Sequence, residues 1–370
     1  MNIGIMSMQR IINYGSFLQA YALKKTIEEK GHNVQFVDYE IGSPLKNEEI
    51  KQKKCNLFTY GLKVLFSPKF RLKRNNLMKQ DQAFGRYYSR FITDWLPQLE
   101  LTEEKNYRPE LDVLVIGSDE VFNCTQAGKD VGYSLQLFGK DNNAKKLITY
   151  AASFGSTTKE KLCMYNKYNE IGDYLKKFDA ISVRDKNSHT LVSQLTEKTP
   201  VDNVDPVLIY DFKSEVNTKV NFDNYVVVYA YSGRINEEEA KKIQEFAHNN
   251  GLKTLSIGVM HSFTDEYVCV DPFTMLSYIK NAKYVVTDTF HGTVFSIKYQ
   301  IPFATIIRDS NREKLVDLLE KFDLSDRCVN NIDDLQSVIL QPLQGDAIKK
   351  KISGYKNDAL SYLNSNLCID

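Results

Sequence analysis

The stretch Met1–Glu40, MNIGIMSMQRIINYGSFLQAYALKKTIEEKGHNVQFVDYE, decides the fold class of this chain. Its apolar run Asn2–Met6 predicts a strand, and Phe17–Lys30 repeats apolar residues at helical spacing up to Gly31, a residue that commonly follows a helix end. Val34–Tyr39 then predicts a second strand. A strand, a helix and a strand in this order pair their strands in parallel, so the stretch predicts a β-α-β unit.

The same alternation of strand and helix continues in two series along the chain. Further β-rich runs, separated by helical stretches, are expected at Val113–Ile116, Leu147–Ala152 and Ala180–Val183. A second series follows the polar stretch Asp211–Asp223. Its strands are expected at Tyr225–Ala230, Thr254–Ile257, Tyr284–Val286 and Phe303–Ile307. This alternation predicts parallel sheets that are covered by helices on both faces.

The chain of 370 residues is long enough for two domains. We therefore expect an α/β protein with two doubly wound, Rossmann-like domains: an N-terminal domain over residues 1–215 and a C-terminal domain over 216–345. A closing amphipathic helix is expected over 346–370. Open sheets of this kind bind ligands beyond the carboxyl ends of their strands, so we expect function in the loops after the strands, at a cleft between the domains.

The composition excludes several classes of protein. Lys and Arg number 48 against 47 Asp and Glu, so a net charge of +1 gives no reason to expect nucleic acid as a partner. No apolar run approaches the roughly 20 residues that span a membrane, and the first residues resemble a strand rather than a secretion signal. The six cysteines lack metal-site or disulfide spacing. We expect a soluble, cytoplasmic protein with reduced thiols and no bound metal.

One segment departs from this neutral background. Between Ile50 and Asp81 the chain carries basic residues and no acidic one, interleaved with aromatic and aliphatic side chains. The segment Lys51–Lys79, within an insertion over residues 50–80, can lie on an anionic membrane surface or hold a phosphate-bearing acceptor. It can equally be a solvated insertion whose aromatic residues cover the N-terminal domain.

Three loops after strands in the first series carry residues suited to binding. Asn13-Tyr14-Gly15-Ser16 opens a helix, whose N-terminus can receive a carboxylate or phosphate or merely form a turn and a cap. Small and acidic residues follow two more predicted strands of this series.

These two strand ends are Gly117–Asp119 and Ser153–Gly155. Ser118 and Asp119 can face the cleft or simply cap the next helix. Gly155 permits either the close approach of a ligand or a turn.

The strand Ala180–Val183 is followed by Arg184. An arginine at a strand end presents a guanidinium fork at the cleft, suited to bidentate binding of a carboxylate or phosphate. The alternative is a surface pair with Asp185. Shortly after, Asp205-Pro206 is expected to form a structural turn at the domain edge.

The sharpest candidate is His291, in the segment Thr287–Thr293. Of the five histidines it alone combines a strand end, a following glycine and a helix start, so we expect its imidazole in the cleft as a general acid. Asp288 can orient it or accept a hydroxyl proton. The neighbouring loop adds Arg308 and Arg312, which can meet an anionic ligand or form a solvated charge cluster.

Taken together and in this order, these motifs resemble the polysaccharide pyruvyl transferase family. The motifs are Asn13-Tyr14-Gly15 with Leu18–Leu23, Gly117-Ser118-Asp119, Ser153-Phe154-Gly155, Val183-Arg184-Asp185, Asp205-Pro206 and Thr287–Gly292. The resemblance implies a GT-B-like fold, with two Rossmann-like domains facing a cleft. It also implies transfer of a carboxyvinyl-derived group from phosphoenolpyruvate to two hydroxyls of a sugar, giving a pyruvate ketal. Phosphoenolpyruvate is then a co-substrate, and no cofactor is implied.

The resemblance also assigns roles to single residues. Family members place the arginine of a Val-Arg-Asp/Glu motif against the donor's carboxylate or phosphate, which corresponds to Arg184. They place the histidine of a His-Gly motif at the reacting centre, which corresponds to His291. Just before that pair they tend to have an arginine, where this chain has Phe290. We expect Arg312 or Arg308 to supply the missing contact.

The expected site then has three parts. The expected catalytic residues are His291, Asp119 and Asp288. The expected donor-binding residues are Arg184, Arg312, Arg308, Gly292 and Ser153. The expected acceptor-binding residues are Asn13, Tyr14, Gly15 and Ser118.

We expect a metal-independent pyruvyltransferase that acts on a sugar of a cell-surface polysaccharide, such as a capsule or exopolysaccharide, or on its lipid-linked precursor. Peripheral contact with the inner face of the membrane would run through Lys51–Lys79. One alternative is a nucleotide-sugar-dependent glycosyltransferase of the same architecture. Another is a non-catalytic carbohydrate-binding member, for which Phe290 is the sequence evidence.

Overall fold

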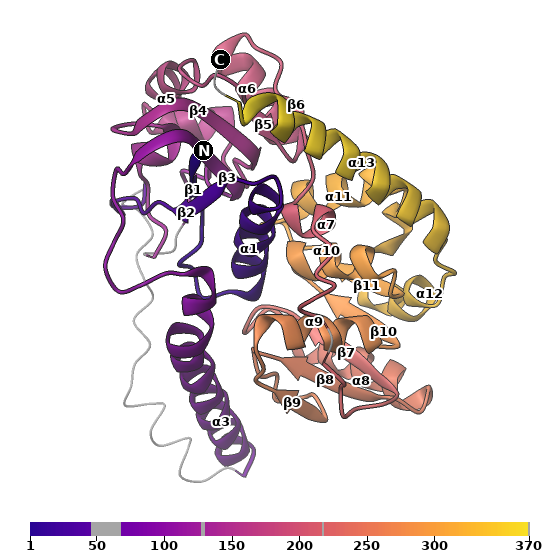
Figure 1. Cartoon of the computed structure of the whole chain (residues 1–370). Coiled ribbons are helices and arrows are strands. Elements are labelled where there is room, and N and C mark those ends of the chain that lie inside the picture. The colour runs from indigo at the N-terminus through magenta and orange to yellow at the C-terminus, as the bar shows by residue number, and fades with distance from the viewer. Residues whose placement is uncertain (46–67, 127–129, 217, 369–370) are drawn as a thin grey trace.

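A computed structural model describes residues 1–45, 68–126, 130–216 and 218–368 (Figure 1). The first half is built on a six-stranded sheet in the order β2-β1-β3-β4-β5-β6, and each neighbouring pair is parallel. The strands are β1 (Asn2–Met6), β2 (Asn33–Phe36), β3 (Glu110–Asp119), β4 (Asn143–Ala152), β5 (Ser182–Val183) and β6 (Val201–Asp202). The predicted β-α-β unit at the start of the chain is confirmed, because β1 and β2 pair in parallel.

The second half is built on another parallel six-stranded sheet, in the order β12-β11-β10-β7-β8-β9. Its strands are β7 (Tyr225–Tyr229), β8 (Lys253–Ile257), β9 (Glu266–Val268), β10 (Tyr284–Thr287), β11 (Phe303–Ile306) and β12 (Cys328–Val329). At its centre Val285 pairs with both Val227 and Phe303, and all three are fully buried. Strands covered on both faces carry nearly continuous apolar runs, which is why the sequence revealed them.

Helices flank both sheets. The helix α1 (Tyr14–Glu28) begins at Tyr14 rather than at Phe17, because the Asn13 side chain accepts a hydrogen bond from the Gly15 N–H and caps it. The other helices are α3 (Pro68–Arg90), α4 (Lys159–Met164), α5 (Tyr168–Leu175), α6 (Lys186–Thr196), α7 (Pro206–Ile209), α8 (Glu237–Asn249), α9 (Pro272–Asn281), α10 (Phe290–Tyr299), α11 (Arg312–Lys321), α12 (Leu335–Ile339) and α13 (Gly345–Asn366). Short turns are the π-helical η1 (Phe91–Trp95) and the 3-10 segments η2 (Leu96–Leu99), η3 (Leu135–Phe138), η4 (Ser325–Arg327) and η5 (Ile332–Asp334).

Buried contacts join the two halves. The rings of Phe17 and Tyr21 on α1 lie 5.8 and 4.8 Å, centroid to centroid, from the ring of Phe273 on α9. The last helix, α13, runs from the second half to the first (Figure 1). There the Tyr362 hydroxyl donates a hydrogen bond to the Thr149 carbonyl of β4 at 2.8 Å. These contacts hold the loops that follow the strands of one sheet against those of the other.

The helix α3 extends from the first half as a long rod (Figure 1), and Gln80 Nε2 near its middle donates to the Met260 carbonyl of the second half at 3.1 Å. Ala83 and Tyr87 form its buried face, whereas Phe84 and Tyr88 are exposed. The ring of Tyr87 lies edge-on to that of Tyr14 at the start of α1, with centroids 5.2 Å apart. This helix therefore brings aromatic side chains to the start of α1.

The predicted basic insertion over residues 50–80 falls largely on residues 46–67, which lie outside the described part of the chain. Membrane contact through Lys51–Lys79 therefore stays a prediction. The helix α3 covers the end of this insertion and continues past residue 80 to Arg90, and this helix was not predicted from the sequence. No helix within the described ranges is both long and apolar enough to cross a membrane.

Candidate active site

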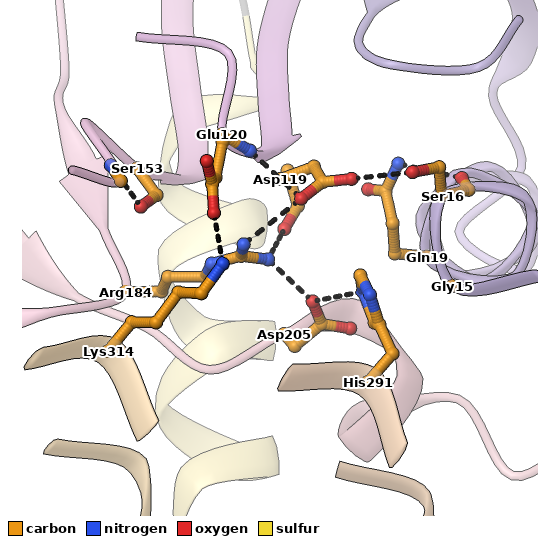
Figure 2. A network of polar contacts seen from close by, with 12 residues as sticks. Gly15, Ser16, Gln19, Asp119, Glu120, Ser153, Arg184, Asp205, His291 and Lys314 are labelled. Carbon is orange, nitrogen blue, oxygen red and sulfur yellow. Dashed lines mark hydrogen bonds and ion pairs between the residues drawn. The ribbon is translucent and has the colours of Figure 1, made fainter. Parts of the chain in front are cut away.

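Arg184, which follows β5, lies at the centre of a buried network of charged side chains (Figure 2). Its Nη1 donates to Asp205 Oδ2 at 2.8 Å, and its Nη2 donates to Asp119 Oδ1 at 3.1 Å. The ring of Phe290 lies against the guanidinium, with its centroid 4.2 Å from Cζ. The Arg184 side chain is only 2% exposed. The residue that departs from the family pattern, Phe290, thus covers one face of this cation.

The surface pair between Arg184 and Asp185, left open by the sequence, is replaced by a different arrangement. Asp185 caps α6, where its Oδ1 accepts a hydrogen bond from the Ser188 N–H at 2.8 Å. The guanidinium therefore points inward, toward the two halves' shared interior (Figure 2).

Asp119, the last residue of β3, accepts hydrogen bonds from two side chains of the first half. Its Oδ2 accepts from the Ser16 hydroxyl of α1 at 2.8 Å, and its Oδ1 accepts from Arg184. Burial alone would raise the pKa of Asp119, but the positive charges of Arg184 and His291 hold that pKa below its ordinary value. Asp119 is therefore a carboxylate at neutral pH.

Asp205 connects Arg184 to His291. As the sequence predicted, Asp205-Pro206 forms a turn, in which Oδ1 accepts from the Val207 N–H at 3.1 Å and caps α7. The same carboxylate, however, places Oδ2 3.4 Å from His291 Nε2 as well as against Arg184. Burial would raise the pKa of Asp205, but His291 and Arg184 hold it low. Interpreting this motif as a structural turn alone was therefore incomplete.

His291 lies in the first turn of α10, directly after β10, where the sequence placed it. His291 belongs to the second half, whereas Asp205 and Arg184 belong to the first. The contact between His291 and Asp205 therefore bridges the two halves. The expected meeting of His291 and Arg184 in one region thus occurs through a shared carboxylate. A carboxylate on one ring nitrogen fixes the orientation of an imidazole and leaves the other nitrogen for proton transfer.

Gly15 allows His291 to pack against the start of α1. A Cβ atom added at Gly15 would lie 2.1 Å from His291 Nδ1 and 2.3 Å from its Cγ, far inside van der Waals contact. Any side chain at this position would therefore displace the imidazole. The start of α1 therefore packs directly against the Nδ1 side of the ring, whereas Nε2 is the nitrogen near Asp205.

Two cavities meet at His291. The first has a volume of about 310 Å³ and is lined by the charged groups Asp119, Glu120, Arg184, Arg234, His291 and Lys314. The second has a volume of about 180 Å³ and is mainly apolar, with Tyr14, Phe84, Tyr87, Tyr229, Tyr231 and Ile257 among its lining residues. Asn13, Tyr231 and His291 line both. The imidazole therefore stands between a charged space and an aromatic one.

Sequence reasoning missed three charged residues of the first cavity. Lys314 on α11 forms an ion pair with Glu120 across the two halves. Arg234 lies in the loop after β7, with its Cζ 4.6 Å from the centroid of the Tyr231 ring. Glu120 and Arg234 follow strands, so the rule that selected Arg184 could have found both. Lys314 lies within a helix and carried no such signal.

The two arginines expected to complete the donor site do not line either cavity at His291. Arg308 instead donates to both oxygens of Glu239 on α8, at 2.6 and 2.9 Å. Arg312 is half-exposed and donates to the Asn330 side chain at 3.2 Å. Both follow β11 as expected, but a carboxylate takes up the first guanidinium and the second faces solvent.

Asp288 lies apart from the imidazole that it was expected to orient. Its Oδ2 is 3.6 Å from Arg308 Nε and 3.9 Å from Arg234 Nη1. Burial raises the pKa of Asp288, although these two arginines oppose the shift. The carboxylate that contacts His291 is that of Asp205.

Ser118 and Ser153 are fully buried behind the charged network. The Ser118 hydroxyl is 3.5 Å from Arg184 Nη1, at the outer limit of a hydrogen bond. The Ser153 hydroxyl accepts from the Gly155 N–H at 2.9 Å and so shapes the turn after β4. Both residues support the position of groups that reach the cavity.

Gly292 and Tyr14 shape the site from the second half and the first. A Cβ at Gly292 would lie 2.2 Å from Thr287 Oγ1, so the glycine lets α10 start close to β10. The Tyr14 hydroxyl donates to the Val270 carbonyl at 2.6 Å, which ties α1 to the second half. Its ring lines the aromatic cavity.

The network makes the stability of the fold sensitive to acid. The pKa values of Asp119 and Asp205 in the folded protein lie below 3.8, their ordinary value, so their ionised forms stabilise the fold above that value. This contribution is lost as the pH falls below it. We expect urea midpoints to fall as the pH is lowered from about 5 to about 2, and to fall less in Asp205→Asn. Stability that rises on acidification, or an equal fall in the variant, would contradict this.

The arrangement supplies a positioned imidazole, ionised carboxylates and cationic side chains around one cavity. These groups can transfer a proton and hold an anion. Within the described ranges, no group of three or more His, Cys, Asp or Glu side chains is placed to hold a metal ion.

A family model described as polysaccharide pyruvyl transferase matches residues 13–310 of the chain. This span includes most of the residues that line the first cavity, among them Arg184 and His291, as well as Asp205. No curated protein sequence matches the chain.

Solved structures with the same architecture cover nearly the whole chain. A structure titled as a co-structure of S. aureus MnaA with UDP is 12% identical with a TM-score of 0.50, covering 99% of this chain and 95% of its own. Arabidopsis thaliana UGT89C1 with UDP-L-rhamnose is 10% identical, with a TM-score of 0.49, and covers 100% and 99%. The spinosyn rhamnosyltransferase SpnG with spinosyn aglycone is 10% identical, with a TM-score of 0.48, and covers 99% and 100%. The GT-B-like fold expected from the sequence is confirmed.

Proposed function

The chain belongs to the polysaccharide pyruvyl transferase family, and from this premise we propose that it transfers a pyruvyl group from phosphoenolpyruvate to two hydroxyls of one sugar. The sugar would be part of a cell-surface polysaccharide or of its lipid-linked precursor. The observation that carries the proposal is the position of His291 between a charged cavity and an aromatic one. A reaction that joins a small anion to a sugar needs these two environments on either side of a proton donor.

The proposed chemistry uses the groups around the charged cavity. The His291 imidazole donates a proton to C3 of phosphoenolpyruvate, which becomes a methyl group and leaves an oxocarbenium-like cation at C2. One sugar hydroxyl attacks C2 and forms the first C–O bond. The C2–O bond to phosphate then breaks, phosphate leaves with the electron pair, and a second hydroxyl attacks to close the ketal. One hydroxyl proton restores the imidazole and the other leaves with phosphate.

The carboxylates have separate parts in this proposal. Asp205 contacts Nε2 and so holds the imidazole in one orientation between the two cavities. Asp119 lines the cavity as a carboxylate and can accept the proton of an attacking hydroxyl. The cation at C2 would also be stabilised by this nearby negative charge.

The aromatic cavity is the proposed place of the acceptor sugar. A pyranose ring has apolar faces that pack on aromatic rings, here those of Tyr14, Tyr87 and Tyr231. Asn13 and Ser232 line the same space and can hydrogen-bond to sugar hydroxyls. This agrees with the acceptor role expected for Asn13 and Tyr14.

A lipid-linked acceptor is supported by the outer face of α3. Five large apolar side chains of that region are exposed: Leu77, Met78, Phe84, Tyr88 and Ile92. Phe84 also lines the aromatic cavity, so an apolar surface continues outward from the proposed acceptor site. Binding to vesicles that contain anionic lipid is the measurement that tests this part of the proposal.

The direct test is to incubate the protein with phosphoenolpyruvate and a panel of glycosides and to measure release of phosphate. Acceptor-dependent release, with a pyruvate ketal in the product, supports the proposal. Thermal unfolding with phosphoenolpyruvate or with nucleotide sugars is a second readout, since a ligand at 100 times its dissociation constant stabilises by about 2.7 kcal/mol. Stabilisation by a nucleotide sugar alone would favour a glycosyltransferase, and sugar binding without turnover would favour a non-catalytic protein.

The contact between Gly15 and His291 gives a sharper prediction. In Gly15→Ala the added methyl group would overlap His291 Nδ1, so the imidazole must shift from its present position. We expect turnover to fall by about 100-fold, the cost of misplacing a reacting group by about 1 Å. The matched control is Gly354→Ala in α13, where a Cβ meets no atom within 4 Å and turnover should not change. Normal turnover in a folded Gly15→Ala protein would refute this role of the glycine.

A further inference from the structure

Both terminal nitrogens of the guanidinium expected to bind the donor are already paired with carboxylates, and its Nε, which has no partner in the part of the chain that the structure describes, is buried. Arg184 gives Nη1 to Asp205 and Nη2 to Asp119, and Phe290 covers a face of it. Two carboxylates already surround this single positive charge. A further dianion placed here would meet net negative charge and would have to displace a carboxylate. Arg184 therefore organises Asp119 and Asp205, and another cation must attract the donor.

Arg234 is the guanidinium of the same cavity that remains available. Its side chain is 37% exposed and lines the first cavity from the second half. Its closest carboxylate oxygen, Asp288 Oδ2, is 3.9 Å from Nη1, beyond hydrogen-bond distance. The Tyr231 ring, 4.6 Å from Cζ, supports the guanidinium from one face, and its N–H groups donate no hydrogen bond to any residue that the structure describes.

Lys314 adds a second positive charge to that side of the cavity. It lies on α11, also in the second half, and lines the cavity with its partner Glu120. Arg308 is not available for this purpose, because it does not line the cavity and Glu239 accepts from its Nη1 and Nη2. The charges of the second half that face the cavity are thus mainly positive, whereas the first half contributes Asp119 and Glu120.

We propose that Arg234 binds the phosphate group of the donor, with Lys314 as a supporting cation, and so takes the place of the family arginine that is absent at Phe290. The inference deepens the proposed function and rests on it for the identity of the donor. An arginine fork matches a phosphate bidentately, and a phosphate carries the largest charge of the donor. The phosphate would then be held by the second half, and the carbon to be protonated would face His291 of the same half.

The test compares Arg234→Gln and Arg234→Lys with the unchanged protein. In Arg234→Gln we expect the KM for phosphoenolpyruvate to rise by about 10- to 100-fold, the value of a hydrogen bond to a charged group, while kcat at saturating donor and KM for the acceptor change little. Arg234→Lys keeps the charge without the fork and should recover part of the loss. A residue with a merely structural role would not give this split. An unchanged KM in a folded Arg234→Gln protein overturns the proposal.

A binding measurement separates this inference from the proposed reaction. Inorganic phosphate is titrated into the unchanged protein, into Arg234→Gln and into the control Arg312→Gln, whose guanidinium lies outside the cavity. We expect phosphate affinity to fall at least about tenfold in Arg234→Gln only. If the protein does not use phosphoenolpyruvate but this fall is seen, the reaction is wrong and the anion site stands. If phosphate does not bind, or binds Arg234→Gln equally well, the anion site is wrong.

Discussion

Replacing His291 with alanine is expected to lower the rate of acceptor-dependent phosphate release by about 100- to 10,000-fold, the usual contribution of a general acid. The reason is that the imidazole is the proton donor that both cavities share. Affinity for phosphoenolpyruvate should change much less, because the proposed anion contact lies on Arg234. Steady-state kinetics with a thermal-shift measurement of donor binding distinguishes the two effects.

The chain offers a matched control for this substitution. His248 lies on the exposed face of α8, with Nε2 3.0 Å from a carboxylate oxygen of Asp265. It is therefore also an imidazole paired with an aspartate, but it lines neither cavity. His248→Ala should keep full turnover. A folded His291→Ala protein with more than about a tenth of the normal rate would rule out the general-acid role.

The second large effect concerns stability. In Arg184→Ala the buried carboxylates Asp119 and Asp205 lose their shared cation, and we expect the free energy of unfolding to fall by about 3–5 kcal/mol. Urea denaturation at neutral pH measures this. Part of the loss should return on acidification of Arg184→Ala relative to the unchanged protein, because protonation then removes an uncompensated charge.

The control for Arg184 is the half-exposed Arg312. Arg312→Ala breaks only surface contacts with Asn330 and Asp309, so its unfolding free energy should change by about 0–1 kcal/mol. If Arg184→Ala were as stable as the unchanged protein and had lost donor binding instead, Arg184 would be a free ligand contact and the assignment to Arg234 would be weakened.

The sheets could be predicted from the sequence because their physical signal is local. Strands buried on both faces, such as β7 and β10, appear as short apolar runs between helical stretches, and parallel pairing follows from chain connectivity. His291, Arg184 and Asp119 could be found by the same reasoning, since each lies at or just after a strand end. Their convergence across two sheets could only be expected from the fold class.

The partners of these residues could not be predicted in the same way. Asp205 has an ordinary local role as a helix cap, and nothing in its neighbourhood shows that its second oxygen meets Arg184 and His291. Arg308 satisfied the strand-end rule, but Glu239, which also completes the capping box of α8, takes up its guanidinium. Competition among charged groups depends on tertiary distances, and no spacing in the sequence encodes those distances.

The single Asp205 carboxylate that touches both Arg184 and His291 has a consequence for motion. The aspartate belongs to the first half and the imidazole to the second. A hinge rotation that moves the two groups even a few ångströms apart would therefore break their contact. The reactivity of His291 would then depend on the angle between the two halves. A donor bound by the second half and an acceptor bound against α1 would together draw the two halves closed. The proton donor would then reach its reactive position only when both substrates are bound.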